Sequence, residues 1–261
     1  MKTLGSHRRH PAAIVVLLLL GLLTTGGLYS LLAPRPAQAA VGTADDVNAG
    51  RKLFLANCAT CHGLHGQGNK IGPSLIGVGA AAVDFQVGTG RMPASGPALP
   101  QVPRGKQVMF TNQEIANLAA YVATLGPGPA IPDSQYTPGD GSIARGNELF
   151  KVNCAMCHNF AGSGGALTRG KFAPSLRNAT GKHIYEAMLT GPQSMPVFND
   201  QNLSPTDKND VISYLHDLDK NKNPGGLSLG NLGPVSEGMF VWIFGLGLVV
   251  GAAVWLGSKA A

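Results

Sequence analysis

The chain has 261 residues, of which 44% are hydrophobic, and it carries a formal net charge of +6 at pH 7. The length suits one large or two small domains, and the hydrophobic content excludes a chain that is disordered throughout. Most of the excess positive charge lies before position 40, beside an apolar run, and no block of basic residues alternates with aromatic residues. This distribution argues against nucleic-acid binding and indicates a signal for membrane topology.

The first expected element is an uncharged apolar segment from Ala12 to Ala33. Its length in a helix, at 1.5 Å per residue, matches the roughly 30 Å hydrocarbon core of a bilayer. Signal-peptide cores are usually shorter, about 7–15 residues, so we expect a retained membrane helix. Cleavage is the alternative, because Ala37-Gln38-Ala39 resembles a small-x-small signal peptidase site. Residues 1–44 are thus interpreted as a basic cytoplasmic end followed by a transmembrane or signal segment.

An internal repeat organises the central part of the chain. Residues 57–63 read NCATCHG, and residues 153–159 read NCAMCHN. Three further motifs follow each copy in the same order. Gly72-Pro73-Ser74-Leu75 in the first repeat corresponds to Ala173-Pro174-Ser175-Leu176 in the second, and Thr89-Gly90 corresponds to Thr190-Gly191. The helical run that contains Tyr121 corresponds to the one that contains Tyr214. We predict two homologous, all-α domains at residues 45–126 and 142–222, joined by a Pro/Gly-rich, non-helical linker at residues 127–141.

Local signals predict a helix near the end of each repeat. Thr111-x-x-Glu114 is a capping-box pattern, and Ser204-Pro205 combines an N-cap with a first-turn proline. Few runs alternate as strands do, and Gly162 to Gly165 is expected to be a surface loop.

The chain ends with a second apolar segment. After a linker at residues 223–237, a transmembrane helix is predicted at residues 238–257, with a cytoplasmic tail at residues 258–261. Trp242 and Trp255 near its ends are typical of membrane interfaces. Basic residues flank the outer ends of the two apolar segments, at His7, Arg8, Arg9 and Lys259. We therefore expect both termini in the cytoplasm and the domains between them on the extracytoplasmic side.

All four cysteines lie in two copies of Cys-x-x-Cys-His, at Cys58, Cys61, Cys154 and Cys157. A zinc ribbon would place its two pairs about 15–20 residues apart, whereas these pairs lie in separate repeats. A reactive dithiol would need a βαβ setting, which the sequence does not indicate. In c-type haem binding, both cysteines bond to haem vinyl groups and the adjacent histidine binds the iron. Only this chemistry explains the histidine in both copies, so we predict two covalently bound haem c groups with His62 and His158 as iron ligands.

The sixth iron ligand is predicted to be a methionine in each repeat. A cytochrome that only transfers electrons usually fills this position with Met. Met92 and Met195 each stand directly before a proline, in a loop that precedes the last helix. The other methionines and histidines of the repeats are expected to be core or surface residues and not iron ligands: Met156, Met188, His65, His183 and His216.

With these motifs, each repeat resembles a class I cytochrome c domain. Gly50 with Phe54, and Gly146 with Phe150, lie four apart on the helix before each haem motif. The resemblance implies that this glycine and aromatic pack against the last helix, where Tyr121 and Tyr214 match. Two such domains before a C-terminal span resemble the dihaem cytochrome c subunits of the actinobacterial cytochrome bc complex, a menaquinol:cytochrome c reductase. This second resemblance covers about residues 45 to 257 and rests on architecture and the apolar tail.

The resemblance implies an electron-relay subunit in the respiratory chain. Its partners would be a cytochrome b subunit, a Rieske iron–sulfur subunit and an aa-type cytochrome c oxidase. It would form part of a quinol–cytochrome c reductase, with no bond-making chemistry in this chain itself. The alternatives are a cytochrome subunit of another membrane enzyme, such as a cbb-type oxidase or an alcohol dehydrogenase, and a dihaem peroxidase. Two Met-Pro loops argue against the peroxidase, which needs an open or displaceable iron ligand.

Overall fold

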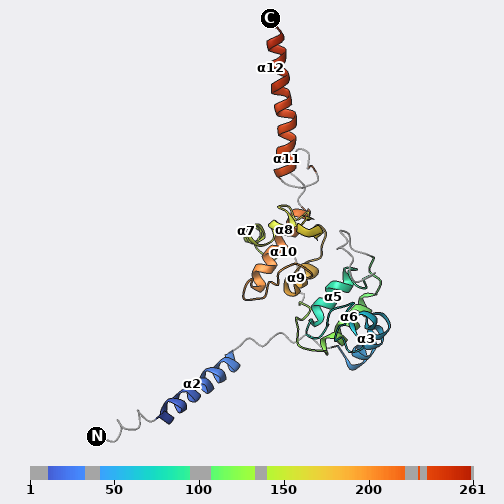
Figure 1. The fold of residues 1–261 in the computed structure, drawn as a ribbon, viewed down its shortest axis with the longest axis vertical. Helices are drawn as coiled ribbons and strands as arrows, with labels where there is room; N and C mark the ends of the chain where they lie inside the picture. The colour runs from blue at the N-terminus through green and yellow to red at the C-terminus, as the bar shows by residue number, and fades with distance from the viewer. Residues whose placement is uncertain are drawn as a thin grey trace, which may run out of the picture. The chain divides into compact units, whose positions relative to one another are not determined.

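The computed structural model describes residues 11–32, 42–94, 107–132, 140–220, 229 and 234–259. It divides into two units, Met1–Gln38 and Ala39–Ala261. The described elements are almost all helical (Figure 1), which confirms the expected all-α class. The basic residues before position 11, the Ala37-Gln38-Ala39 motif and parts of both predicted linkers lie outside the described residues.

The first unit contains α2 (Pro11–Leu32), a single helix of 22 residues. Its polar side chains are bonded within the helix, since the hydroxyls of Thr24 and Thr25 donate to the carbonyls of Leu20 and Gly21 at 2.8 and 2.6 Å. Such bonds satisfy hydroxyl groups in a medium without water. Ala12–Leu31 is long and apolar enough to cross a membrane, as expected for this segment.

The second unit begins with four helices: α3 (Ala44–Asn57), α4 (Ala59–His62), α5 (Gly79–Gly88) and α6 (Asn112–Ala123). Helices α3 and α6 both start with a capping box, at Thr43 and Thr111. The second box confirms the pattern predicted from Thr111-x-x-Glu114. A hydrophobic core forms among α3, α5 and α6, with Phe54, Leu118 and Val122 almost fully buried.

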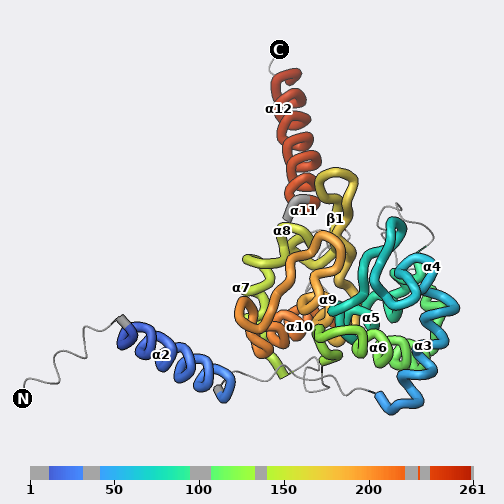
Figure 2. Tube along the Cα trace, turned by 60° about the horizontal axis from the view of Figure 1, so that its bottom comes forward, coloured from blue at the N-terminus to red at the C-terminus, as the bar shows by residue number. Residues whose placement is uncertain are grey.

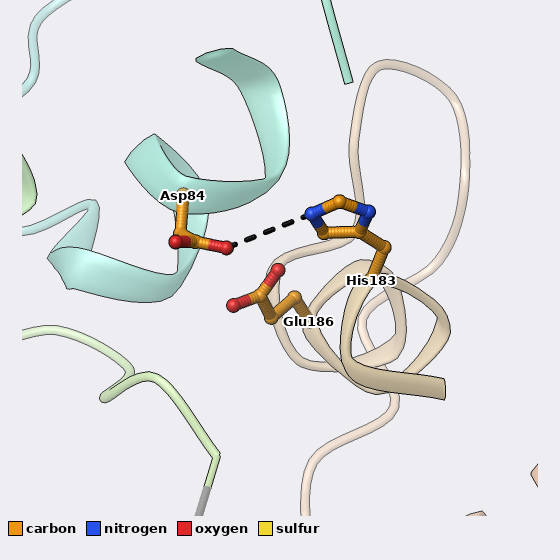
Figure 3. A group of neighbouring side chains, drawn as sticks. All are labelled: Asp84, His183 and Glu186. Atoms are coloured by element: carbon orange, nitrogen blue, oxygen red, sulfur yellow. Dashed lines mark ion pairs between the residues drawn. The ribbon is translucent and has the colours of Figure 1, made fainter. Parts of the chain in front are cut away.

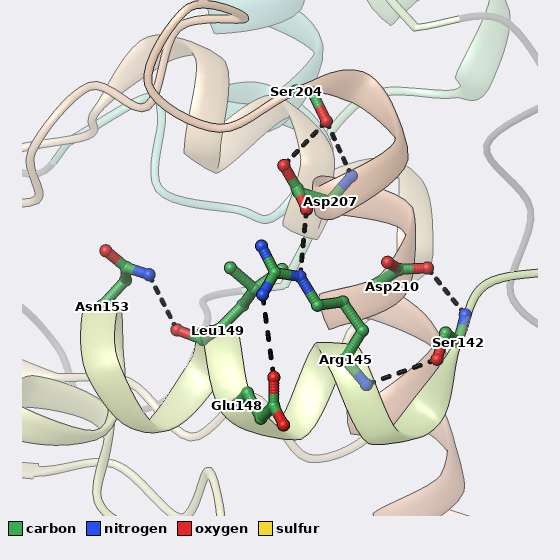
Figure 4. Close-up of polar contacts among 8 residues, drawn as sticks. All are labelled: Ser142, Arg145, Glu148, Leu149, Asn153, Ser204, Asp207 and Asp210. Carbon is green, nitrogen blue, oxygen red and sulfur yellow. Dashed lines mark hydrogen bonds and ion pairs between the residues drawn. The ribbon is translucent and has the colours of Figure 1, made fainter.

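The second repeat forms a similar set of helices: α7 (Ile143–Asn153), α8 (Ala155–His158), α9 (Gly181–Thr190) and α10 (Pro205–Lys220). Its own core contains Phe150, Ile212 and Leu215. Ser204 Oγ accepts a hydrogen bond from the backbone of Asp207 at 3.2 Å, which confirms the predicted cap of α10. Figure 4 shows this cap beside α7, where Ser142 N donates to Asp210 Oδ1 at 2.6 Å and connects the starts of the two helices.

A short hairpin in the second repeat was not predicted. Strand β1 (Gly165–Ala166) pairs antiparallel with β2 (Phe172–Ala173), and a single 3₁₀ turn, η2 (Thr168–Gly170), joins them. The segment expected to be only a loop thus begins a ladder of two residue pairs. Two residues are too few for a visible hydrophobic alternation, so the sequence pattern carried no signal for this hairpin.

The first and last helices of each repeat cross where a glycine lies. A Cβ atom on Gly50 would overlap the backbone oxygen of Asn117 in α6, and one on Gly146 would overlap that of Asp210 in α10. Beside each crossing an aromatic pair packs, Phe54 with Tyr121 at 5.2 Å and Phe150 with Tyr214 at 5.5 Å between ring centroids. These are the contacts that the resemblance to class I cytochrome c implied.

Substituting alanine for Gly146 should destabilise the second domain by about 2 kcal/mol. Alanine gains about 1 kcal/mol of helix propensity over glycine, but its Cβ would overlap the Asp210 carbonyl and lie 2.9 Å from Tyr214 Cβ. Overpacking of this kind costs about 1–3 kcal/mol, and more where backbone must move. Thermal unfolding of the haem-loaded chain measures the effect. Gly165→Ala is the control, because a Cβ at Gly165 meets nothing within 4 Å; equal midpoints for both variants would refute the close crossing.

The C-terminal part of the second unit is one long helix, built from α11 (Pro234–Val241), a π-helical turn η4 (Trp242–Leu246) and α12 (Gly247–Lys259). Ser236–Lys259 is long and apolar enough to span a membrane, with a mean hydropathy of 2.3. It contains the predicted span at residues 238–257, and Figure 1 shows it as the red helix that ends the chain.

Candidate haem sites

Each Cys-x-x-Cys-His motif forms a single helical turn. Cys58 follows the end of α3, and the backbone N–H groups of Cys61 and His62 donate to its carbonyl at 3.1 and 2.9 Å. The second motif repeats this geometry at the same two distances, with Cys154 as the acceptor. Because residues three apart lie on one face of a helical turn, both cysteines of a motif lie on the same side of the chain. The four thiols are not joined by disulfides.

The two motif histidines are buried and held by backbone carbonyls. Nδ1 of His62 lies 2.8 Å from the carbonyl oxygen of Pro73, and Nδ1 of His158 lies 3.0 Å from that of Pro174. A carbonyl only accepts, so Nδ1 carries the proton and Nε2 keeps its lone pair. This tautomer is the one that ligates a metal through Nε2. Burial lowers the pKa of His158, which also favours the neutral, ligating form.

The leading cysteine of each motif is a poor nucleophile as a free thiol. Burial, followed by the charge of Cys61, raises the pKa of Cys58 to about 11. Burial and Cys157 raise the pKa of Cys154 to about 11 in the same way. Dithiol redox sites need a thiolate with a lowered pKa, so these values argue against that alternative.

Met92 and Met195 are both half-buried and pack against the hydrophobic cores of their own repeats. Each follows the helix before its loop, α5 or α9, and the Met92 backbone donates to the Gln86 carbonyl at 2.9 Å. Met156 and Met188 behave as expected, since Met156 is 89% exposed and Met188 is a core residue at 2%. Each repeat therefore offers two thiols, one imidazole nitrogen and one thioether, a donor set that fits haem c.

Comparison with known proteins places both repeats in cytochrome families. Residues 47–126 match the family model "Cytochrome c", and residues 141–215 match "Cytochrome C oxidase, cbb3-type, subunit III". The "Cytochrome bc1 complex cytochrome c subunit" of Mycobacterium leprae is 46% identical over 260 residues, which cover 94% of this chain and 87% of that relative. This chain belongs to the family of cytochrome bc1 complex cytochrome c subunits. It contains two cytochrome c domains and is a haem-binding electron-transfer protein.

Other relatives support the same assignment for this cytochrome c subunit. The protein of that name in Corynebacterium efficiens is 42% identical over 276 residues, covering 97% of this chain and 90% of the relative. A "Cbb3-type cytochrome c oxidase subunit CcoP" from Azospirillum sp. is 30% identical, but over only 50% of this chain and 46% of that relative. The match to the bc1 family extends over nearly the whole chain, including the apolar ends.

The loop that follows Met195 in this cytochrome c subunit is held by contacts that the sequence did not reveal. Lys208 is fully buried, and its Nζ donates to Asp200 Oδ1 and to the Leu203 carbonyl, both at 2.7 Å. Lys171 Nζ, in the hairpin turn directly before β2, donates to Ser194 Oγ at 2.6 Å. These bonds fix the backbone on both sides of Met195. A buried lysine three residues into a helix has no distinctive sequence signal, since lysines at such positions are mostly solvated.

Proposed function

We propose that this cytochrome c subunit binds two haem c groups covalently, one in each domain. Cys58 and Cys61 would form the thioethers of the first site, with His62 and Met92 as axial iron ligands. Cys154 and Cys157 would do so in the second site, with His158 and Met195 as axial ligands. The support is the repeated donor set and the two carbonyl-bound histidines. The proposed domain limits are residues 45–126 and 142–222, with linkers at residues 127–141 and 223–237.

The finer function that we propose is an electron relay. The subunit would take electrons from the Rieske iron–sulfur centre of a menaquinol-oxidising cytochrome bc complex and pass them to an aa-type oxidase. Bound haem supplies the one-electron redox chemistry; the protein provides ligands, a buried setting and docking surfaces. The observation that carries this proposal is the same His and Met pair in both domains, because two filled axial positions leave no place for a substrate.

The proposed location follows from the two apolar helices. With both spanning the cell membrane, the haem domains would lie on the extracytoplasmic side and both termini in the cytoplasm, next to the basic residues that flank the spans. The cytochrome b and Rieske subunits are the proposed partners within the membrane complex. Membrane attachment beside them keeps the haem domains near the source of electrons.

Carbon monoxide separates this relay from a haem enzyme with an open iron position. We expect the reduced native chain to keep its visible spectrum under carbon monoxide, because both irons are six-coordinate. Met92→Ala is the positive control and should open one of the two sites, so that about half of the haem shows the spectral shift. A carbon monoxide shift in the native chain, or peroxide turnover by it, would favour the peroxidase alternative.

The second domain also matches a cbb3-type oxidase model, so a role in a cbb-type oxidase, or in an alcohol dehydrogenase, is the second candidate. Purification of the native membrane complex decides between them by its co-purifying subunits. The relay predicts cytochrome b and a Rieske protein, whereas the alternatives predict an oxidase or dehydrogenase catalytic subunit.

A further inference from the structure

The two haem domains contact each other through α5 and α9, and three metal-ligating side chains meet there. Figure 3 shows Asp84 on α5 facing His183 and Glu186 on α9. One ligand atom from each lies within 4.8 Å of the others. His183 and Glu186 share one face of α9 because they are three residues apart. His183 Nε2 lies 3.7 Å from Asp84 Oδ2.

Among the three residues of this cluster, Glu186 is the acidic residue without an ion pair. Its side chain is fully buried and no basic side chain donates a hydrogen bond to either carboxylate oxygen, so the group that faces it is the Asp84 carboxylate, to which a protonated Glu186 donates. Burial and the neighbouring Asp84 charge raise the pKa of Glu186 to about 9. Two buried carboxyl groups side by side are costly unless a positive charge balances them, and only Asp84 has an ion pair with a lysine. A cation between the two domains would supply this charge.

The donor chemistry selects the class of cation. One imidazole nitrogen and two carboxylates form a three-residue set that suits Zn²⁺ and related divalent transition metals, with a fourth position left for water. Mg²⁺ and Ca²⁺ prefer six or more oxygen ligands, which this cluster does not provide. Since Zn²⁺ binds nitrogen and oxygen at about 2.0–2.2 Å, the three side chains would each move by less than about 1 Å to reach it.

One basic side chain occupies part of this space. Lys182 Nζ lies 2.7 Å from Asp84 Oδ2, but its side chain is 46% exposed and can turn into solvent. Although burial opposes it, hydrogen bonds from His183 and Lys182 lower the pKa of Asp84 to about 2, so Asp84 is charged and ready to ligate. A Cβ on Gly88 would lie 3.2 Å from His183 Nε2, so the glycine leaves room at the ligating nitrogen. Arg91 is a further basic residue nearby in the sequence, and its Cζ atom stacks 4.6 Å from the centroid of the ring of Phe85, the residue after Asp84.

We propose that Asp84, His183 and Glu186 form a binding site for one divalent transition-metal cation, with Zn²⁺ as its representative, between the two haem domains. The cation and the Lys182 ammonium group compete for Asp84. Binding joins α5 to α9 through side chains of both helices. The site is separate from the haem ligands, so its failure would leave the haem assignments intact.

The test is calorimetric titration of Zn²⁺ into the full, haem-loaded chain in detergent, made without a polyhistidine tag and first treated with a chelator. We expect one site per chain. Mg²⁺ at the same concentrations should give no heat of binding.

Matched variants locate the site. Glu186→Gln and His183→Gln should each weaken Zn²⁺ binding at least 100-fold. Lys182→Met removes the competing ammonium group and should tighten binding about tenfold. His65→Gln and Glu148→Gln change exposed side chains elsewhere in the two domains and should leave the affinity unchanged. The visible haem spectrum reports that each variant is folded.

Three results would overturn the proposal. They are native-level Zn²⁺ affinity in both Glu186→Gln and His183→Gln, a loss of affinity in the two control variants, and binding by Lys182→Met that is no tighter than native. Lys182 is half-exposed, so its replacement should not prevent folding. The Zn²⁺ affinity of Lys182→Met therefore tests the proposal even if Glu186→Gln and His183→Gln do not fold.

Discussion

Replacing Cys154 and Cys157 together with alanine should halve the covalently bound haem of the purified chain. Both thioether bonds of the second site are lost in this variant, whereas the first domain keeps its own motif, histidine and core. The two domains have separate hydrophobic cores, so we expect the first site to mature independently. A pyridine haemochrome assay after acid-acetone extraction gives the haem count per chain, with two expected for the native protein and one for the variant.

The control for this experiment lies inside the same motif. Met156 stands between the two cysteines and is 89% exposed, so Met156→Leu should retain two haems per chain. The mirror variant, with Cys58 and Cys61 replaced, should also retain one haem. A haem content that stays at two in either cysteine variant, or a native chain with one haem or none, would contradict the proposed attachment.

Met195→Ala should stop the reduction of both haem sites by quinol. Met92→Ala should leave the reduction of the second site by quinol intact, while oxygen consumption stops. This result follows if electrons pass from the Rieske centre to the second site, then to the first site and on to the oxidase. The proposed linker of residues 223–237 joins the second domain to the C-terminal apolar helix, and it would restrict the position of this domain above the membrane. The first domain, residues 45–126, carries a formal charge of +2, against zero for residues 133–222. A mildly basic domain suits an acidic docking face, with faster association at low salt.

Rapid mixing of the membrane complex with quinol decides the order. In Met92→Ala, quinol should still reduce the second site at its native rate. If the first site is reduced at its native rate in Met195→Ala, the order is reversed and the first domain faces the Rieske centre. Met188→Leu is a matched control, because Met188 is a buried core residue of the same domain and leaves the proposed ligands intact.

The sequence predicted the features that depend on local spacing. The spacing of four residues predicted that Gly50 and Phe54 share one helix face, whereas the close crossing and the ring contact with Tyr121 were expected only from the resemblance to class I cytochrome c. The caps at Thr111 and Ser204 were predicted for the same reason, since a cap involves residues only three positions apart. Composition alone predicted the two apolar helices, although the second extends beyond its expected limits of 238–257, to Ser236–Lys259.

Features that depend on how distant segments dock were not predicted. His183 was assigned to surface or structural roles because the first repeat has no matching histidine, yet it lies beside Asp84 of the other domain. Ninety-nine positions separate the two residues in the sequence, and no local pattern connects them. The contact of Lys208 with Asp200 depends in the same way on the path of the loop after Met195.

The contact between α5 and α9 joins equivalent elements of the two repeats, since each helix is followed by the Thr-Gly pair and then by the Met-Pro loop. A surface that meets its own counterpart is the arrangement of an isologous homodimer. In a homodimer, such a surface must be complementary to itself, so an acid on one copy needs a base at a different position of that same copy. A tandem chain is free of this requirement. Here the first domain supplies the acidic residue, Asp84, and the second supplies the basic residues, Lys182 and His183. The positions of the first domain that are equivalent to these two basic residues are Ala81 and Ala82. Fusion of two copies into one polypeptide thus allows the halves to recognise each other without two separate chains pairing through the same surface.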